Sequence, residues 1–214
     1  MGKVIFISGL RRSGTTILSD ILTEFKKVRL FYEPFGNNHA PGGGGSGLNK
    51  IDVAKNTRFA KESFLKNHDN ISIDYLNRGA PKNHILEIEN KELDDIETSF
   101  LRSIIHGSNK VPLLKFTRAA FLTSQLYNIA KNALFLHVIR EPRSWVSAHL
   151  TCSNKNHKIL KNPKLFFNKD NGFNWWSMES IANDFVRANN YSLWKKPGYY
   201  KLLYIWHSFN KKIQ

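Results

Sequence analysis

The stretch Val4-Ile5-Phe6-Ile7-Ser8-Gly9-Leu10-Arg11-Arg12-Ser13-Gly14-Thr15-Thr16-Ile17-Leu18 decides the fold of this chain. It begins as a short apolar, β-branched run, which predicts a buried strand of a parallel sheet. It ends in a predicted helix whose apolar residues are Ile17, Leu18, Ile21, Leu22 and Phe25. Between them lies a loop bounded by Gly9 and Gly14. A strand, a glycine-bounded loop and a helix N-terminus predict a site for a phosphate-like anion, because backbone N–H groups converge there.

The loop departs from the phosphate-binding loop of nucleoside triphosphatases in one informative way. Its two glycines and Thr16 fit the pattern G-x-x-x-x-G-K-[ST], but Thr15 takes the lysine position. The cations come earlier in the loop, as Arg11 and Arg12. We therefore predict a site for an anion other than a triphosphate. An ordinary strand-to-helix turn with two solvated arginines is the alternative.

Length and charge bound the class of protein. The 214 residues suit a single domain over residues 1–214, and the net charge of +15 favours an anionic partner. Nucleotides, acidic glycans, nucleic acids and membrane surfaces are such partners, although scattered lysines also serve solubility. Cys152 is the only cysteine, so no internal disulfide can form. We find neither a signal peptide nor a membrane span in the sequence and expect a cytoplasmic location.

The rest of the chain alternates between predicted strands and helices. Further strands are expected over residues 28–32, 111–116 and 133–139. Helices are expected over residues 57–67, 87–106, 144–150, 177–194 and 199–212, with Thr117 as the cap of another helix. This alternation predicts an α/β fold with a central parallel sheet. The glycine-rich run 42–47 looks like an engineered linker, and a natural disordered loop is the alternative.

Two charged residues stand at the ends of predicted strands. Glu33 follows the strand at 28–32, and Lys115 lies near the end of the strand at 111–116. Ligands of open α/β sheets bind at the carboxyl ends of the strands, which makes both residues site candidates. A surface loop acid is the alternative for Glu33. The sequence has eight histidines but no cluster with zinc spacing, so no metal is expected.

Two segments together resemble the sulfotransferase family, whose members transfer a sulfuryl group from 3′-phosphoadenosine 5′-phosphosulfate (PAPS). Residues 9–16 are similar to the 5′-phosphosulfate loop of that family, written (K/R)-S-G-[TS]-[TS] after a first strand. Residues 135–143 are similar to its 3′-phosphate segment, an apolar strand followed by R-[DN]-P-[RK]. The resemblance covers roughly residues 3–36 and 111–150. It implies a P-loop-type three-layer sandwich with a central parallel sheet.

The resemblance implies a donor site made from both segments. Arg12 takes the place of the loop cation that steadies the bridging oxygen and the transferred sulfuryl group. The 5′-phosphate would be wrapped by Ser13, Gly14, Thr15 and Thr16, and Arg11 and Arg12 would also bind the cofactor. Arg140 would bind the 3′-phosphate. The family serine eight residues later is Ala148 here, and either Ser147, one residue earlier, or Ser144 is the expected substitute.

The resemblance also implies a general base. Glu33 falls 21 residues after Arg12, as the catalytic glutamate does in the protein-tyrosine sulfotransferase branch. The context Tyr32-Glu33-Pro34 is similar to the carbohydrate branch, so a hydroxyl of a carbohydrate or glycoconjugate is the expected acceptor. Lys115 sits where cytosolic sulfotransferases place a lysine near the sulfate. The histidine base of those enzymes, two residues later, is Thr117 here, which again leaves Glu33 as the base.

Two other functions stay open at this point. A phosphate-loop nucleotide kinase is disfavoured by Thr15 in the lysine position and by the lack of a clear aspartate for magnesium. A basic nucleic-acid-binding domain would explain the charge but not the two strand ends that carry arginines. The chain ends at Gln214, where many sulfotransferases continue, so either a truncated chain or a compact version of the fold is expected.

Overall fold

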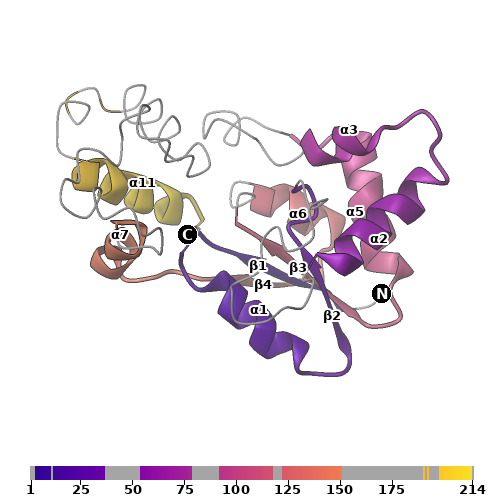
Figure 1. The fold of residues 1–214 in the computed structure, drawn as a ribbon, viewed down its shortest axis with the longest axis horizontal. Coiled ribbons are helices and arrows are strands. Elements are labelled where there is room, and N and C mark those ends of the chain that lie inside the picture. The colour runs from indigo at the N-terminus through magenta and orange to yellow at the C-terminus, as the bar shows by residue number, and fades with distance from the viewer. Residues whose placement is uncertain are drawn as a thin grey trace. The chain divides into compact units, whose positions relative to one another are not determined.

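The computed structural model describes residues 3–10, 12–36, 54–78, 92–117, 122–150, 190, 192 and 198–213. The chain forms two compact units, Met1–Ala80 with Lys91–Val138 and Pro81–Asn90 with Ile139–Gln214. The first unit contains a sheet with helices packed on it (Figure 1). The second unit contains α7 (Pro142–Leu150) and α11 (Gly198–Ile213), which contact each other.

A parallel sheet of four strands lies at the centre of the described part of the first unit. The strands are β1 (Ile5–Ser8), β2 (Val28–Tyr32), β3 (Val111–Phe116) and β4 (Leu134–His137), in the order β2-β3-β1-β4. Every neighbouring pair is parallel, so the carboxyl ends of all four strands meet at one edge. The predicted α/β fold with a central parallel sheet is confirmed. The bounds of β2 and β3 are as predicted, whereas β4 is shorter than the predicted 133–139.

Helices cover both faces of this sheet (Figure 1). One face carries α1 (Thr15–Thr23), whose Leu18 and Leu22 pack against the core formed by Ile7, Leu30 and Leu113. The other face carries α2 (Lys55–Leu65), α3 (Ile73–Arg78), α5 (Asp95–Gly107) and α6 (Thr123–Ile129). Successive residues of a strand point to opposite faces, which separates the two cores. The helix predicted over residues 57–67 corresponds to α2, which begins and ends two residues earlier.

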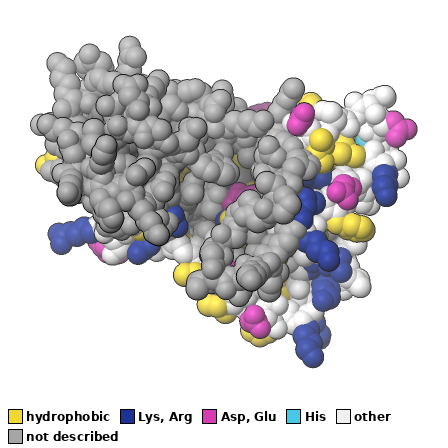
Figure 2. All heavy atoms as spheres, viewed as in Figure 1, with side chains coloured by type: hydrophobic (Ala, Val, Ile, Leu, Met, Phe, Trp, Pro, Cys, Tyr) yellow, Lys and Arg dark blue, Asp and Glu magenta, His cyan; other side chains and the backbone are white. Residues whose placement is uncertain are grey.

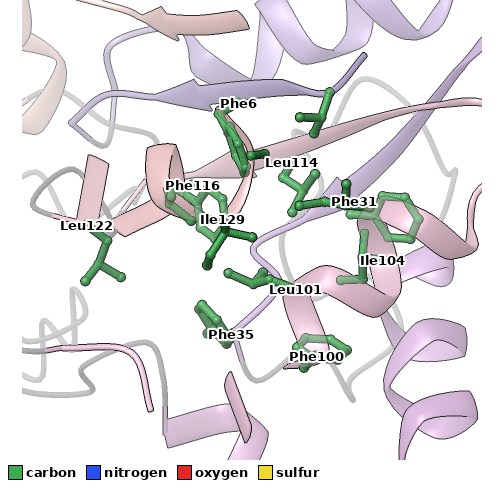
Figure 3. Close-up of a cluster of buried hydrophobic side chains, with 14 of the residues drawn as sticks. Phe6, Phe31, Phe35, Phe100, Leu101, Ile104, Leu114, Phe116, Leu122 and Ile129 are labelled. Carbon is green, nitrogen blue, oxygen red and sulfur yellow. The ribbon is translucent and has the colours of Figure 1, made fainter. Parts of the chain in front are cut away.

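A chain of aromatic rings runs through the larger core from β4 to α5, and Figure 3 labels its members Phe6, Phe116, Phe35 and Phe100. Phe135 stacks on Phe6 with 4.9 Å between ring centroids, and Phe6 and Phe35 each lie 6.3 Å from Phe116. Phe35 in turn lies 6.1 Å from Phe100. Aromatic pairs at such distances add about 0.5–1.5 kcal/mol each to the burial of their area. Because Phe35 is buried, the turn that begins at Glu33 is anchored in the core.

Strand β2 lies at an edge of the sheet, and α2 covers its free side. The Nδ2 of Asn56 donates to the backbone oxygen of Leu30 at 3.0 Å, and the Oγ1 of Thr57 donates to that of Tyr32 at 3.0 Å. These bonds satisfy outward-facing carbonyls that an exposed edge strand would leave open to a foreign strand. The same contacts hold the carboxyl end of β2 in place.

Three predicted helix features are wrong. The helix expected over 87–106 begins at Asp95, because Asp94 and Glu97 form a capping box. The helix after β3 begins at Thr123, and Thr117 makes other contacts instead of capping it. The predicted apolar face of the first helix is only partly used. Its other members Ile17, Ile21 and Phe25 are 56–63% exposed, because only the stripe of Leu18 and Leu22 reaches the sheet.

On the face shown in Figure 2, several lysine and arginine side chains of the described surface lie next to one another at the lower right. Aspartate and glutamate side chains occur singly on the same face. The predictions for Arg11, the run 42–47 and most of the helix 177–194 lie outside the described residues.

In the part of the chain that is described, no helix is both long and apolar enough to span a membrane.

Candidate active site

The loop between β1 and α1 depends on both of its glycines. A Cβ on Gly9 would lie 2.7 Å from the backbone oxygen of Val138, so no larger residue fits there. Gly14 has φ of 102° and precedes the first turn of α1. The backbone N–H of Ser13 donates to the oxygen of Leu10 at 3.0 Å and closes the loop. Because no side chain caps α1, its first N–H groups are suited to an anion.

The predicted loop residues differ in exposure. Arg12 is exposed, Thr16 is half-buried, and Ser13 and Thr15 are buried. The loop is compact, because Ser13 and Thr15 are buried in it. Among its described residues, Arg12 is the cation that faces solvent. The described residues of the loop therefore combine backbone donors with the exposed guanidinium of Arg12, which suits a bound phosphate or sulfate.

Glu33 is tied to the end of β3 through its backbone. Its N–H donates to the oxygen of Lys115 at 2.9 Å, and its own oxygen accepts from the N–H of Gly36 at 2.7 Å. Glu33 thus begins a tight turn directly after β2. Since β3 lies between β2 and β1, Glu33 and the loop share one edge of the sheet at about 10 Å, two strand spacings.

The carboxylate of Glu33 accepts hydrogen bonds from Lys115 and Thr117. The Nζ of Lys115 lies 2.9 Å from Oε1, and the Oγ1 of Thr117 donates to the same oxygen at 2.6 Å. The backbone N–H of Thr117 lies 2.9 Å from Oε1 and 3.2 Å from Oε2. Two residues predicted from separate strands, Glu33 and Lys115, are therefore brought into direct contact.

Lys115 is a buried cation beneath this carboxylate. Its side chain is 1% exposed, and its Nζ also lies 4.0 Å from the centroid of the Tyr32 ring. Burial by itself would lower the pKa of Lys115, but the Glu33 carboxylate and Tyr32 outweigh it and raise that pKa above its ordinary value. Lys115 therefore stays charged. Burial also raises the pKa of Asp20 on α1, and the positive charge of Lys115 opposes that rise.

Backbone strain coincides with the predicted site. Arg12 (φ 68°) and Glu33 (φ 45°) are the non-glycine residues with positive φ in the described part of the chain. The left-handed region costs a non-glycine residue about 1–3 kcal/mol, and such residues cluster at active sites. Both of these residues were predicted from the sequence as catalytic.

The predicted 3′-phosphate residues belong to the second unit. Arg140 comes three residues after β4; its side chain is exposed, and its backbone oxygen accepts from the Nε1 of Trp206 at 2.8 Å. Ser147 is exposed on α7. Glu141 caps α7, because its carboxylate accepts from the backbone N–H groups of Ser144 at 2.7 Å and Arg143 at 2.9 Å. These bonds hold the pKa of Glu141 below its ordinary value.

Thr117 contacts the predicted base, Glu33, and was not predicted from the sequence as a site residue. The pattern of a polar residue before an apolar run indicated a helix cap, whereas the structure places Thr117 on the Glu33 carboxylate. A signal was present, because the resemblance aligned Thr117 with the base of other sulfotransferases.

A hollow of about 540 Å³ lies between α2, α5 and β2. Arg29, Phe59 and Arg102 are among its lining residues, and none of the predicted site residues lines it.

The sequence matches a known protein family. The model of the sulfotransferase family matches residues 4–179. The chain belongs to the sulfotransferase family. No curated protein matches its sequence. Because the chain belongs to this family, its activity is sulfuryl transfer. The parallel sheet flanked by helices is the fold expected for a sulfotransferase.

Proposed function

We propose that this sulfotransferase moves a sulfuryl group from PAPS to a hydroxyl of a carbohydrate or glycoconjugate, with Glu33 as the general base. The observation that carries the proposal is the Glu33 carboxylate, held at the carboxyl edge of the sheet by Lys115 and Thr117. Family membership supplies the reaction type. The held carboxylate supplies a group that can take a proton from an acceptor hydroxyl.

The loop after β1 suits the 5′-phosphosulfate of the donor. Uncapped N–H groups of α1 and the neighbouring residues Ser13 to Thr16 offer donors to a phosphate. Arg12, exposed beside them, would neutralise the bridging oxygen and the transferred group. Arg140, with Ser147, would bind the 3′-phosphate, and Arg11 would add to the charge of the loop.

The proposed reaction is an in-line displacement at sulfur. Glu33 takes the proton of the acceptor hydroxyl while the acceptor oxygen forms a bond to sulfur. The bond from sulfur to the phosphate oxygen breaks, and its electron pair leaves with the nucleotide bisphosphate. Positioning and charge stabilisation carry most of such a group transfer, and the scheme needs no metal. A positioned base contributes about 10²–10⁴-fold to such reactions.

Two features favour a glycan acceptor. The context Tyr32-Glu33-Pro34 is similar to the carbohydrate branch of the family, and the net charge of +15 favours anionic polymers. A contact from α2 and the burial of Phe35 hold the turn after β2 in place. The backbone of Glu33 is therefore fixed rather than part of a loose loop. The acceptor would therefore meet the base at a defined position.

Calorimetric titration with adenosine 3′,5′-bisphosphate in the absence of magnesium tests the donor assignment. We expect the bisphosphate to bind to the wild-type chain. Arg140→Ala should weaken binding by at least tenfold, because an arginine–phosphate contact is lost. Arg102→Ala, which removes an exposed arginine from α5, is the charge-matched control and should leave the affinity within twofold.

Other binding patterns would contradict the proposal. Binding of ATP only together with magnesium would favour a nucleotide kinase. Binding of DNA or RNA that falls steeply with salt, without competition from the bisphosphate, would favour a nucleic-acid-binding domain.

A further inference from the structure

We propose that Thr117 is a positioning residue that holds the Glu33 carboxylate in the orientation in which it takes the proton of the acceptor. The inference rests on the proposed role of Glu33 as the base. It concerns a contact that joins residues far apart in the sequence, at the ends of β2 and β3.

The two carboxylate oxygens have different surroundings. Oε1 accepts from the Nζ of Lys115, the N–H of Thr117 and the Oγ1 of Thr117, at 2.6–2.9 Å. A carboxylate oxygen has about two lone-pair positions, so the three donors on Oε1 more than use its capacity. Oε2 lies at 3.2 Å from the N–H of Thr117, a longer contact. Oε1 is therefore the oxygen through which Lys115 and Thr117 anchor the carboxylate.

Thr117, together with Lys115, restricts the rotation of the carboxylate about its last bond. That torsion of glutamate is soft and roughly two-fold, so the side chain by itself does not choose an orientation. The N–H of Thr117 contacts both oxygens, and its hydroxyl contacts Oε1 alone. The hydroxyl is therefore the contact of Thr117 that distinguishes the two oxygens.

Thr117 itself is well placed to act as an anchor. It follows Phe116, which is 2% exposed and lies in the aromatic chain of the core. A β-branched side chain has few χ1 rotamers, so the direction of its hydroxyl is restricted. The proton of the Thr117 hydroxyl stays on Oγ1 throughout the reaction, because its role is to donate to Oε1.

The substitutions Thr117→Val and Thr117→Ser separate positioning from simple packing. Valine keeps the shape and the backbone N–H but removes the hydroxyl, whereas serine keeps the hydroxyl. Transfer of sulfur-35 from labelled PAPS to a panel of p-nitrophenyl glycosides and unsulfated glycosaminoglycans gives kcat and KM. Thermal unfolding midpoints and adenosine 3′,5′-bisphosphate affinity are measured on the same samples, with Glu33→Gln as the reference.

We expect Thr117→Val to lower kcat by about 10- to 100-fold, the size of effect that a misplaced catalytic group produces. KM for the acceptor and affinity for the bisphosphate should stay within twofold. Thr117→Ser should restore kcat to within about threefold of the wild type, because it returns the donor to Oε1. Should valine lower the unfolding midpoint strongly, the pair Thr117→Ala and Thr117→Ser gives the same comparison.

Two results would overturn the inference. One is a kcat for Thr117→Val equal to that of the wild type while Glu33→Gln is inactive, which would leave Glu33 as a base that needs no help from Thr117. The other is an equal loss of kcat in the valine and serine variants. Full turnover in Glu33→Gln would instead contradict the proposed base itself, whatever Thr117 does.

Discussion

Two buried lysines of the first unit show how the environment of a single residue decides its charge. Lys115 is 1% exposed and ion-paired to Glu33, and this pair raises its pKa despite burial. Lys61 on α2 is also 1% exposed, and its Nζ donates to the backbone oxygen of Gly36 at 2.7 Å. Burial lowers the pKa of Lys61 to about 7. Lys115 is thus a permanent cation beside Glu33, whereas Lys61 titrates near neutral pH.

The lowered pKa of Lys61 predicts how stability depends on pH. Between about pH 7 and the ordinary lysine value of 10.5, the unfolded chain holds more protons than the folded one, so stability rises with pH. The contribution of one such group approaches about 1.4 kcal/mol per pH unit. Lys61→Met should remove this rise, whereas Lys66→Met, an exposed control after the same helix, should keep it.

Urea unfolding of these two variants and the wild type at pH 6.5, 7.5, 8.5 and 9.5 checks the prediction. The profile of Lys61→Met should be flatter than the other two. Parallel profiles for all three proteins would show that Lys61 does not titrate in this range.

At the scale of elements, the loop from β1 to α1 is built around a close backbone contact. Gly9→Ala would place a Cβ 2.7 Å from the oxygen of Val138, which forces β1 and β4 to shift. We expect a loss of about 1–3 kcal/mol in unfolding free energy, as for other overpacked sites. Binding of adenosine 3′,5′-bisphosphate should weaken as well, since the loop geometry changes.

Gly107 provides the matched control for this substitution. It ends α5, and a Cβ there meets no atom within 4 Å. Gly107→Ala should be neutral or stabilise by up to about 1 kcal/mol, because alanine favours the helix. Chemical unfolding of both variants gives the comparison; equal effects of the two substitutions would refute the close-contact account of Gly9.

The elements also show what could be predicted from sequence and what could not. Short, mainly apolar runs predicted the bounds of β2 and β3, although Arg29 interrupts the first run and Lys115 the second. The start of α5 was missed although Asp94 and Glu97 carried the capping signal. The contact between Glu33 and Thr117 spans 84 positions and leaves no local pattern. It depends on the strand order, which places β2 beside β3.

At the scale of the whole molecule, the family match and the sheet account for the reaction type, and the proposed base gives it a mechanism. Glu33, Lys115 and Thr117 form one group at the carboxyl edge of the sheet. The two arginine-bearing segments, at Arg12 and Arg140, belong to different units of the chain. The proposal that both bind one nucleotide is therefore tested by nucleotide affinity, and the proposal that Glu33 is the base is tested by turnover.

Single-turnover transfer of sulfur-35 from PAPS to the acceptor panel, in wild type and Glu33→Gln, tests the central claim most directly. Glu62→Gln, an exposed acid on α2, is the matched control. We predict that Glu33→Gln binds adenosine 3′,5′-bisphosphate as the wild type does but transfers label about 10²–10⁴-fold more slowly, while the control is unchanged. Transfer by Glu33→Gln at the wild-type rate would contradict the account.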